Sequence, residues 1–181
     1  MTTAGTCAVA AGLALAISGV CLALFFMTDR EAWGRANDAT IALFAVLMIP
    51  AVLEVQTPQA AGAFGVAGLL VIAVSSALTA AGKFDWLLSA KIGGVGFAGF
   101  MLWMIAACVS IIRDGTLPNA LGWLGLLTAG LVALGLVVVL PFIKTHGRLF
   151  EDADPPTAVW IAPTAAYLCL VVWTVWLGFA L

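Results

Sequence analysis

Long apolar runs follow one another along nearly the whole of this chain, separated by short polar segments. Each run holds about 20 residues or more, the length that an α-helix needs to cross the ~30 Å hydrocarbon core of a bilayer. The pattern therefore predicts an all-α polytopic membrane protein, a bundle of six transmembrane helices. The predicted helices are Ala4–Met27, Asp38–Thr57, Ala60–Gly82, Ile92–Ile112, Asn119–Leu140 and Ala158–Leu181.

The composition agrees with this pattern. Hydrophobic residues make up 64% of the 181 residues and charged residues 9%, whereas charged residues are about 25% of a soluble domain. The connections between the spans are short, so residues 1–181 are expected to form one transmembrane domain. The net charge is −2 and no basic face is evident, which excludes nucleic acid as a partner.

The basic residues predict the orientation of the bundle. Arg113 is the basic residue on the side that holds both termini, and the other side holds the remaining six: Arg30, Arg35, Lys83, Lys91, Lys144 and Arg148. Short loops rich in Lys and Arg remain in the cytoplasm. We therefore expect a multi-pass protein of the inner (plasma) membrane with both termini outside. In this scheme Asn37 or Asp38 caps the second helix.

Small residues inside the spans are expected to serve packing. Gly94-x-Gly96-x-x-Gly99 lies within a predicted helix rather than between a strand and a helix, so it does not indicate a dinucleotide site. Glycines at 122, 125, 130 and 135 are expected to let helices approach closely. The four cysteines lie singly in apolar spans, with no CxxC pair and no nearby histidine. Neither a metal site nor a cofactor is therefore expected.

Glu54 is the acidic residue that this pattern places inside a span. If the second helix ends near Thr57, the Glu54 carboxyl lies only ~5 Å below the outer boundary. Two interpretations follow. The side chain extends outward beside Gln56, or it occupies a low-dielectric pocket, where it stays protonated and can donate a proton.

The seven tryptophans fall into two groups. Five lie near the predicted membrane boundaries, where interfacial tryptophans are common, namely Trp33, Trp86, Trp123, Trp160 and Trp176. Trp103 and Trp173 lie deeper, and a buried indole N–H requires an acceptor. Both could serve packing alone. Alternatively, they line a cavity that opens toward the outer side together with Glu54, Gln56, Phe64, Asp114, Trp123 and Trp176.

The alanine-rich spans and one segment at the start of the fifth helix suggest a family. That segment reads Leu117-Pro118, followed by Gly122-Trp123-Leu124-Gly125. In these features the chain resembles small actinobacterial six-helix integral membrane proteins. Some proteins of this size and type are membrane-bound terpene cyclases, including those of drimentine-type pathways. The resemblance implies an isoprenoid-type substrate and assigns no catalytic residue.

We favour an integral membrane enzyme that cyclises or isomerises an apolar isoprenoid-type molecule taken from the lipid bilayer. Glu54 would donate the proton, and Asp114 or Gln56 would orient it. Four indoles would stabilise the carbocation through their π faces, namely Trp103, Trp123, Trp173 and Trp176. Two alternatives stay open, a small membrane transporter and an accessory or assembly subunit without catalytic activity. A homo-oligomer is also left open.

Overall fold

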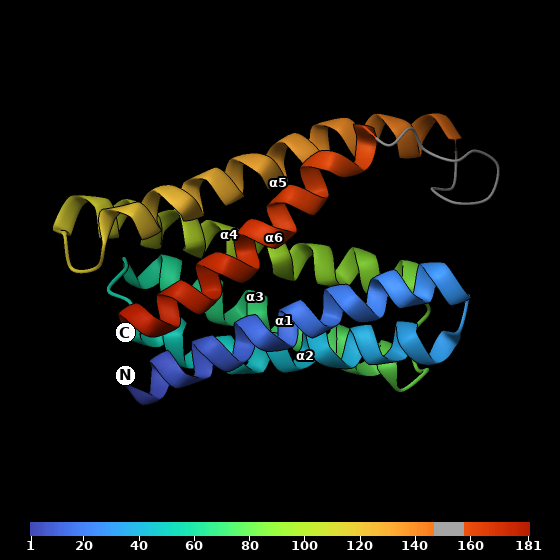
Figure 1. The fold of residues 1–181 in the computed structure, drawn as a ribbon, viewed down its shortest axis with the longest axis horizontal. Coiled ribbons are helices and arrows are strands. Elements are labelled where there is room, and N and C mark those ends of the chain that lie inside the picture. Colours follow the sequence, from blue (N-terminus) through green and yellow to red (C-terminus); the bar gives the residue numbers. More distant parts are fainter. Residues whose placement is uncertain (147–157) are drawn as a thin grey trace.

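The computed structural model describes residues 1–146 and 158–181, and these residues form six helices (Figure 1). The helices are α1 Thr3–Thr28, α2 Glu31–Glu54, α3 Gln59–Ala80, α4 Trp86–Asp114, α5 Asn119–His146 and α6 Ala158–Ala180. Within them, the side chains at 86, 136, 138–146 and 158–160 are not described. Five helices are long and apolar enough to cross a membrane, and the apolar part described for α5 is the shorter stretch Asn119–Gly135. The predicted all-α class is confirmed for the described residues.

The six helices form a closed ring of neighbours. In chain order each helix packs against the next, and α6 returns to pack against α1. Figure 1 shows both termini at one end of the molecule, together with the turns at 55–58 and 115–118. We call this the termini end. The opposite end carries the turns at 29–30 and 81–85.

Two helices begin more than one turn earlier than the hydropathy pattern predicts. α2 begins at Glu31 instead of Asp38, and α4 begins at Trp86 instead of Ile92. An ion pair of 3.2 Å between Arg35 and Glu31, one helical turn apart, supports the added turns of α2. The prediction that Asn37 or Asp38 caps this helix is wrong, because the N-cap is Arg30 and no side chain caps the helix.

α3 and α4 pack so closely that glycines must stand at the contact. A Cβ atom on Gly96 would lie 2.6 Å from the carbonyl oxygen of Gly68 and 3.0 Å from the main-chain nitrogen of Ile72. α1 and α6 show the same arrangement, since a Cβ on Gly5 would lie 2.5 Å from the carbonyl oxygen of Gly178. Close backbone approach of this kind drives helix association where lipid supplies no hydrophobic force.

The glycines predicted to pack do not all do so. A Cβ on Gly122 would lie 2.9 Å from the carbonyl oxygen of Cys108, so this glycine lies at the contact between α5 and α4. In contrast, a Cβ on Gly94 or Gly130 would meet nothing within 4 Å. The sequence shows where glycines occur within the helices, but it does not show which of them face a neighbouring helix.

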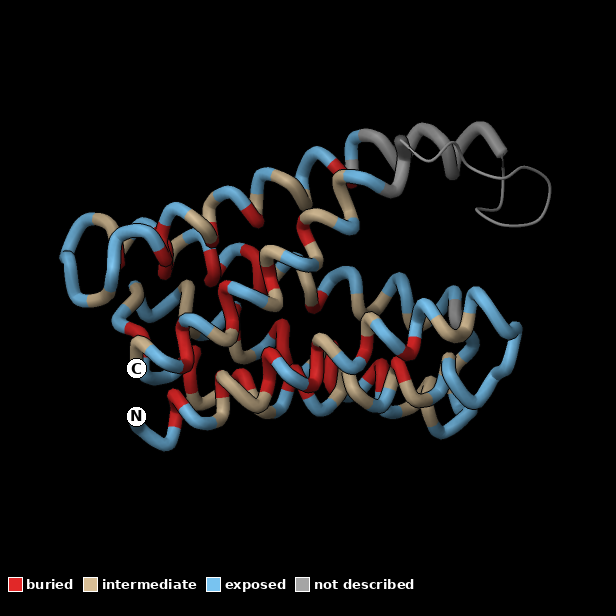
Figure 2. Tube along the Cα trace, viewed as in Figure 1, coloured by how far each residue is buried: buried red, intermediate tan, exposed pale blue. Residues whose placement is uncertain are grey.

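Aromatic rings connect three helices in the core. Phe44 of α2 contacts Phe100 of α4 with ring centroids 5.9 Å apart. Phe100 stacks on Trp103 at 5.6 Å, and Trp103 meets Trp173 of α6 edge-on at 6.1 Å. All four side chains are at most 2% exposed. Figure 2 shows buried residues running between α1, α2, α3 and α4 and along the C-terminal half of α6.

The glycine contact can be tested with two substitutions in one helix. Gly96→Ala should destabilise the protein by about 1–3 kcal/mol, because the added methyl group would collide with the backbone of α3. Gly94→Ala is the matched control, and it should be neutral or stabilising by up to about 1 kcal/mol through helix propensity alone. The measurement is unfolding of the detergent-purified protein, followed by far-UV circular dichroism. Equal effects of the two substitutions would contradict the α3–α4 contact.

Candidate functional site

A pocket of about 340 Å³ opens at the termini end, between the α2–α3 turn and the last turns of α4. The turn contributes Gln56, Thr57 and Pro58, and α4 contributes Ser110, Arg113 and Asp114. Residues three and four apart on a helix share a face, which explains why Ser110 stands beside Arg113 and Asp114. The pocket therefore combines a cation, a carboxylate, an amide and two hydroxyl groups.

Two chain reversals hold these groups at the same end. α2 ends at Glu54, and Pro58 is the N-cap of α3 with an extended backbone. α4 ends at Asp114, and its C-cap is Gly115, whose φ of 63° is the left-handed conformation that glycine adopts without strain. The Gly115 N–H donates to the carbonyl oxygen of Ile111 at 3.0 Å. The last turn of α4 is thereby fixed, with Arg113 and Asp114 on it.

The polar side chains of the pocket are not committed elsewhere in the described part of the chain. Helical threonines such as Thr40, Thr128 and Thr174 donate to a carbonyl oxygen one turn earlier. In residues 1–146 and 158–181, no such bond forms for the Ser110 hydroxyl, and the ion pair present is Arg35–Glu31 at the opposite end. The guanidinium, amide and hydroxyl groups of the pocket are therefore free to bind a ligand.

The structure brings together two of the predicted site residues and separates the others. Gln56 and Asp114 line the same pocket. Glu54 does not line it. This residue is the last of α2 and is exposed, so the protein does not enclose its carboxyl group. Phe64 and Trp123 are 57% and 62% exposed, and neither lines the pocket.

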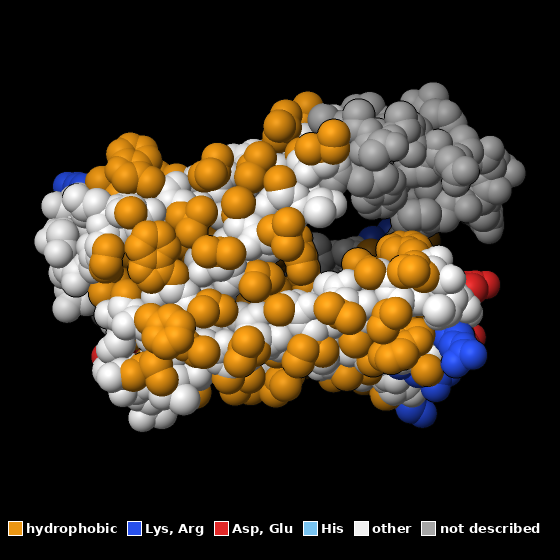
Figure 3. All heavy atoms as spheres, in the orientation of Figure 1, with side chains coloured by type: hydrophobic (Ala, Val, Ile, Leu, Met, Phe, Trp, Pro, Cys, Tyr) orange, Lys and Arg blue, Asp and Glu red, His pale blue; other side chains and the backbone are white. Residues whose placement is uncertain are grey.

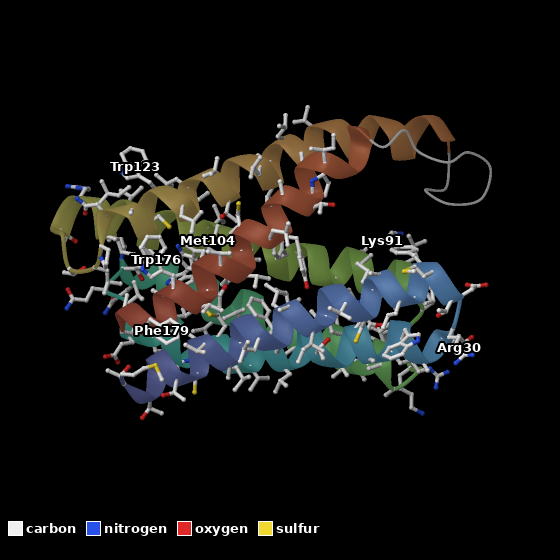
Figure 4. All side chains as sticks on the ribbon, in the orientation of Figure 1. Arg30, Lys91, Met104, Trp123, Trp176 and Phe179 are labelled. Carbon is white, nitrogen blue, oxygen red and sulfur yellow. The ribbon has the colours of Figure 1, made fainter. Side chains whose placement is uncertain are left out.

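The deep tryptophans belong to the core. Trp103 and Trp173 are both fully buried. The Trp173 indole N–H donates to the carbonyl oxygen of Leu121 at 3.1 Å, whereas the Trp103 N–H has no hydrogen-bond partner among the described residues. Trp176 is 37% exposed and lines a separate apolar groove with Phe179. Figure 4 shows Trp176, Phe179 and Trp123 toward the termini end.

The single chamber of acid and aromatic groups that the sequence predicted is therefore absent from the described residues. The Glu54 carboxyl is exposed, and the Trp103 and Trp173 rings are packed against other side chains. A carboxyl that donates a proton to an alkene or epoxide must stay protonated and close to the π faces that stabilise the cation. The catalytic roles of Glu54 and Asp114 remain predictions.

One carboxyl that lies within a long apolar helix was not among the site residues predicted from the sequence. Because α2 begins at Glu31, Asp38 lies about two turns inside the helix, ~10 Å from its start. The Asp38 side chain is half-buried. Next to it, buried Asn37 accepts a hydrogen bond of 2.7 Å from Ser18 of α1. The Glu31–Arg35 spacing was the signal in the sequence that could have extended the helix.

A metal site receives no support from the described residues. Within them, no group of three or more His, Cys, Asp and Glu side chains could hold a metal ion. Comparison of the chain with known proteins finds no matching family model, no similar curated protein and no similar solved structure. The function must therefore be argued from the residues of this chain.

The two buried tryptophans provide a test of the core. Replacing either tryptophan with Phe removes a similar side-chain volume. Trp173→Phe also removes the hydrogen bond to the Leu121 carbonyl oxygen, whereas Trp103→Phe removes an N–H that has no partner among the described residues. Trp173→Phe should therefore cost about 1 kcal/mol more stability than Trp103→Phe. Unfolding of both variants in the same detergent measures the difference. A larger loss for Trp103→Phe would show that its N–H has an acceptor.

Proposed function

We propose that this chain is a plasma-membrane protein with both termini outside, and that it binds an amphipathic molecule at the termini-end pocket. The polar head of the molecule would occupy the pocket, and its apolar tail would lie along α4. The observation that carries this proposal is a set of uncommitted polar side chains directly above an exposed apolar stripe of one helix.

The distribution of charge supports this orientation. Arg30, Arg35, Lys83 and Lys91 all lie at the opposite end, and Figures 3 and 4 show charged side chains gathered there. Arg113 is the basic residue at the termini end. Because short loops rich in Lys and Arg remain in the cytoplasm, the opposite end would be cytoplasmic and the pocket would face outward.

The lining of the pocket indicates the chemistry of the head. Arg113 supplies a guanidinium, which binds phosphate oxygens with two parallel N–H groups. The Gln56 amide and the Thr57 and Ser110 hydroxyl groups add neutral donors. The Asp114 carboxylate would repel a plain anion but accepts hydrogen bonds. A phosphate that also carries hydroxyl groups satisfies both kinds of side chain.

The surface of α4 indicates where the tail would lie. Leu102, Ile105 and Val109 are 57%, 40% and 40% exposed. Their spacing of three and four residues places them on one face of the helix, and Arg113 continues that face into the pocket. An acyl or isoprenoid chain fits such a stripe. Acid-catalysed cyclisation would in addition require that the ligand itself covers Asp114, since this side chain is exposed.

Binding of phosphatidylglycerol, whose head carries a phosphate and two hydroxyl groups, tests the site. Phosphatidylglycerol should bind the detergent-purified full-length protein more tightly than phosphatidylcholine with the same acyl chains. Arg113→Gln should weaken that binding about 10-fold, the cost of one charge-assisted hydrogen bond. Native mass spectrometry of the protein with each lipid provides both affinities.

Arg35→Gln is the matched control, because Arg35 lies at the opposite end and is already paired with Glu31. This variant should bind phosphatidylglycerol as the parent protein does. Equal affinity for the two lipids, or equal losses from the two Arg substitutions, would contradict the proposed site.

The orientation is tested separately with reporters. Alkaline phosphatase fused after Leu181 should be active in a bacterial host, because this enzyme folds only outside the cytoplasm, and green fluorescent protein at the same position should stay dark. Fusion to the turn between α3 and α4, after Gly82, should give the reverse result. Activity of the phosphatase at the turn and not at the C-terminus would invert the proposed topology.

A further inference from the structure

Asp38 lies deeper in the membrane than any other described acidic residue of α2. The helix has 24 residues, a length of ~36 Å, so a centred hydrocarbon core of ~30 Å would begin about two residues from each end. Trp33 would then lie at the boundary, where tryptophan is common. Asp38 lies ~7 Å further in, whereas Glu31 and Glu54 are the terminal residues of the helix.

Asn37, the residue before Asp38, takes part in a buried polar contact between two helices. Ser18 and Asn37 form a hydrogen bond of 2.7 Å between α1 and α2, and they are 1% and 9% exposed. At the contact between α2 and α3, Val52 faces Gly65, since a Cβ on Gly65 would lie 2.9 Å from Val52 Cγ1. Equal steps along the two antiparallel helices bring Asp38 level with Thr79.

Few charged side chains lie on the helices around Asp38. On α2 itself the nearest cation is Arg35, which is paired with Glu31 at 3.2 Å and whose side chain is 60% exposed. α1 carries Cys7 and Cys21 as titratable side chains between its ends, and α3 carries none. Among the described residues, α1 and α3, which pack against α2, carry no cation, and Arg30 and Lys83 lie in the turns beyond the ends of these helices.

An ionised carboxylate at this depth would be poorly hydrated, and Arg35, the cation one turn away on α2, is already paired with Glu31, so ionisation of Asp38 is costly. Binding a proton removes the charge, and Asp38 lies only about two helical turns from the end of α2 that the proposed orientation places at the cytoplasmic surface. We propose that Asp38 is a proton-binding group in the cytoplasmic half of the bundle, beside the buried Ser18–Asn37 hydrogen bond. This site is separate from the termini-end pocket and does not depend on it.

Infrared difference spectroscopy of the full-length protein in lipid vesicles tests this directly. The carbonyl stretch of a protonated carboxyl should change in amplitude as the buffer is cycled between mildly acidic and mildly alkaline pH. Asp38→Asn should abolish that band. Glu54→Gln is the matched control on the same helix, and it should leave the band in place, because Glu54 is exposed.

Two further measurements cover the case in which Asp38→Asn does not fold. In the parent protein, ¹³C at the side-chain carboxyl of aspartate should shift the band, whereas the same label in glutamate should not. Asp38→Glu retains a carboxyl and should move the band rather than remove it. The absence of the band in the parent protein, or its persistence in Asp38→Asn, would show that Asp38 stays ionised and would overturn the proposal.

Discussion

Close approach of helix backbones is the constraint on which the rest of this structure depends. In lipid there is no hydrophobic driving force between apolar helices, so close van der Waals packing must stabilise the bundle. Two glycine contacts meet this requirement, Gly68–Gly96 between α3 and α4, and Gly5–Gly178 between α1 and α6. The first fixes α4 beside α3, which brings Arg113 over the α2–α3 turn. The second closes the ring of helices.

Much of the fold could be predicted from the sequence, because a membrane imposes a minimum length on every apolar helix. The ends of the helices could not be predicted in the same way. Hydropathy marks where a chain leaves the hydrocarbon, whereas a helix continues as long as its hydrogen bonds do. At Glu31 and Trp86 the helices extend past the apolar pattern, supported by the Glu31–Arg35 pair and by Asp85, which caps α4 by accepting from Leu88 N–H at 2.7 Å.

The difference between the apolar pattern and the true helix ends affects which site residues the sequence can predict. The sequence predicts that Gln56 and Asp114 lie near the outer boundary, and both line one pocket at the termini end, while their roles stay predictions. The hydropathy pattern starts the second helix at Asp38 and predicts Asn37 or Asp38 as its cap, although both residues lie within α2. The depth of Trp103 and Trp173 was predicted correctly, but depth alone does not distinguish a ring in a cavity from one packed against Phe100 and its neighbours. The two ends of the bundle consequently carry different chemistry, an open polar pocket at one end and a half-buried carboxyl at the other.

The register of α3 against α4 is the central claim, and one disulfide tests it most directly. A Cβ on Gly93 would lie 3.3 Å from the Ser75 hydroxyl oxygen, close to the Cβ–sulfur separation across a disulfide. In a variant without the four native cysteines, Ser75→Cys with Gly93→Cys should oxidise to a disulfide in vesicles, detected by intact mass and loss of thiol labelling. Ser75→Cys with Gly94→Cys should not. Equal oxidation of both pairs, or oxidation of the second alone, would contradict the packing on which this account depends.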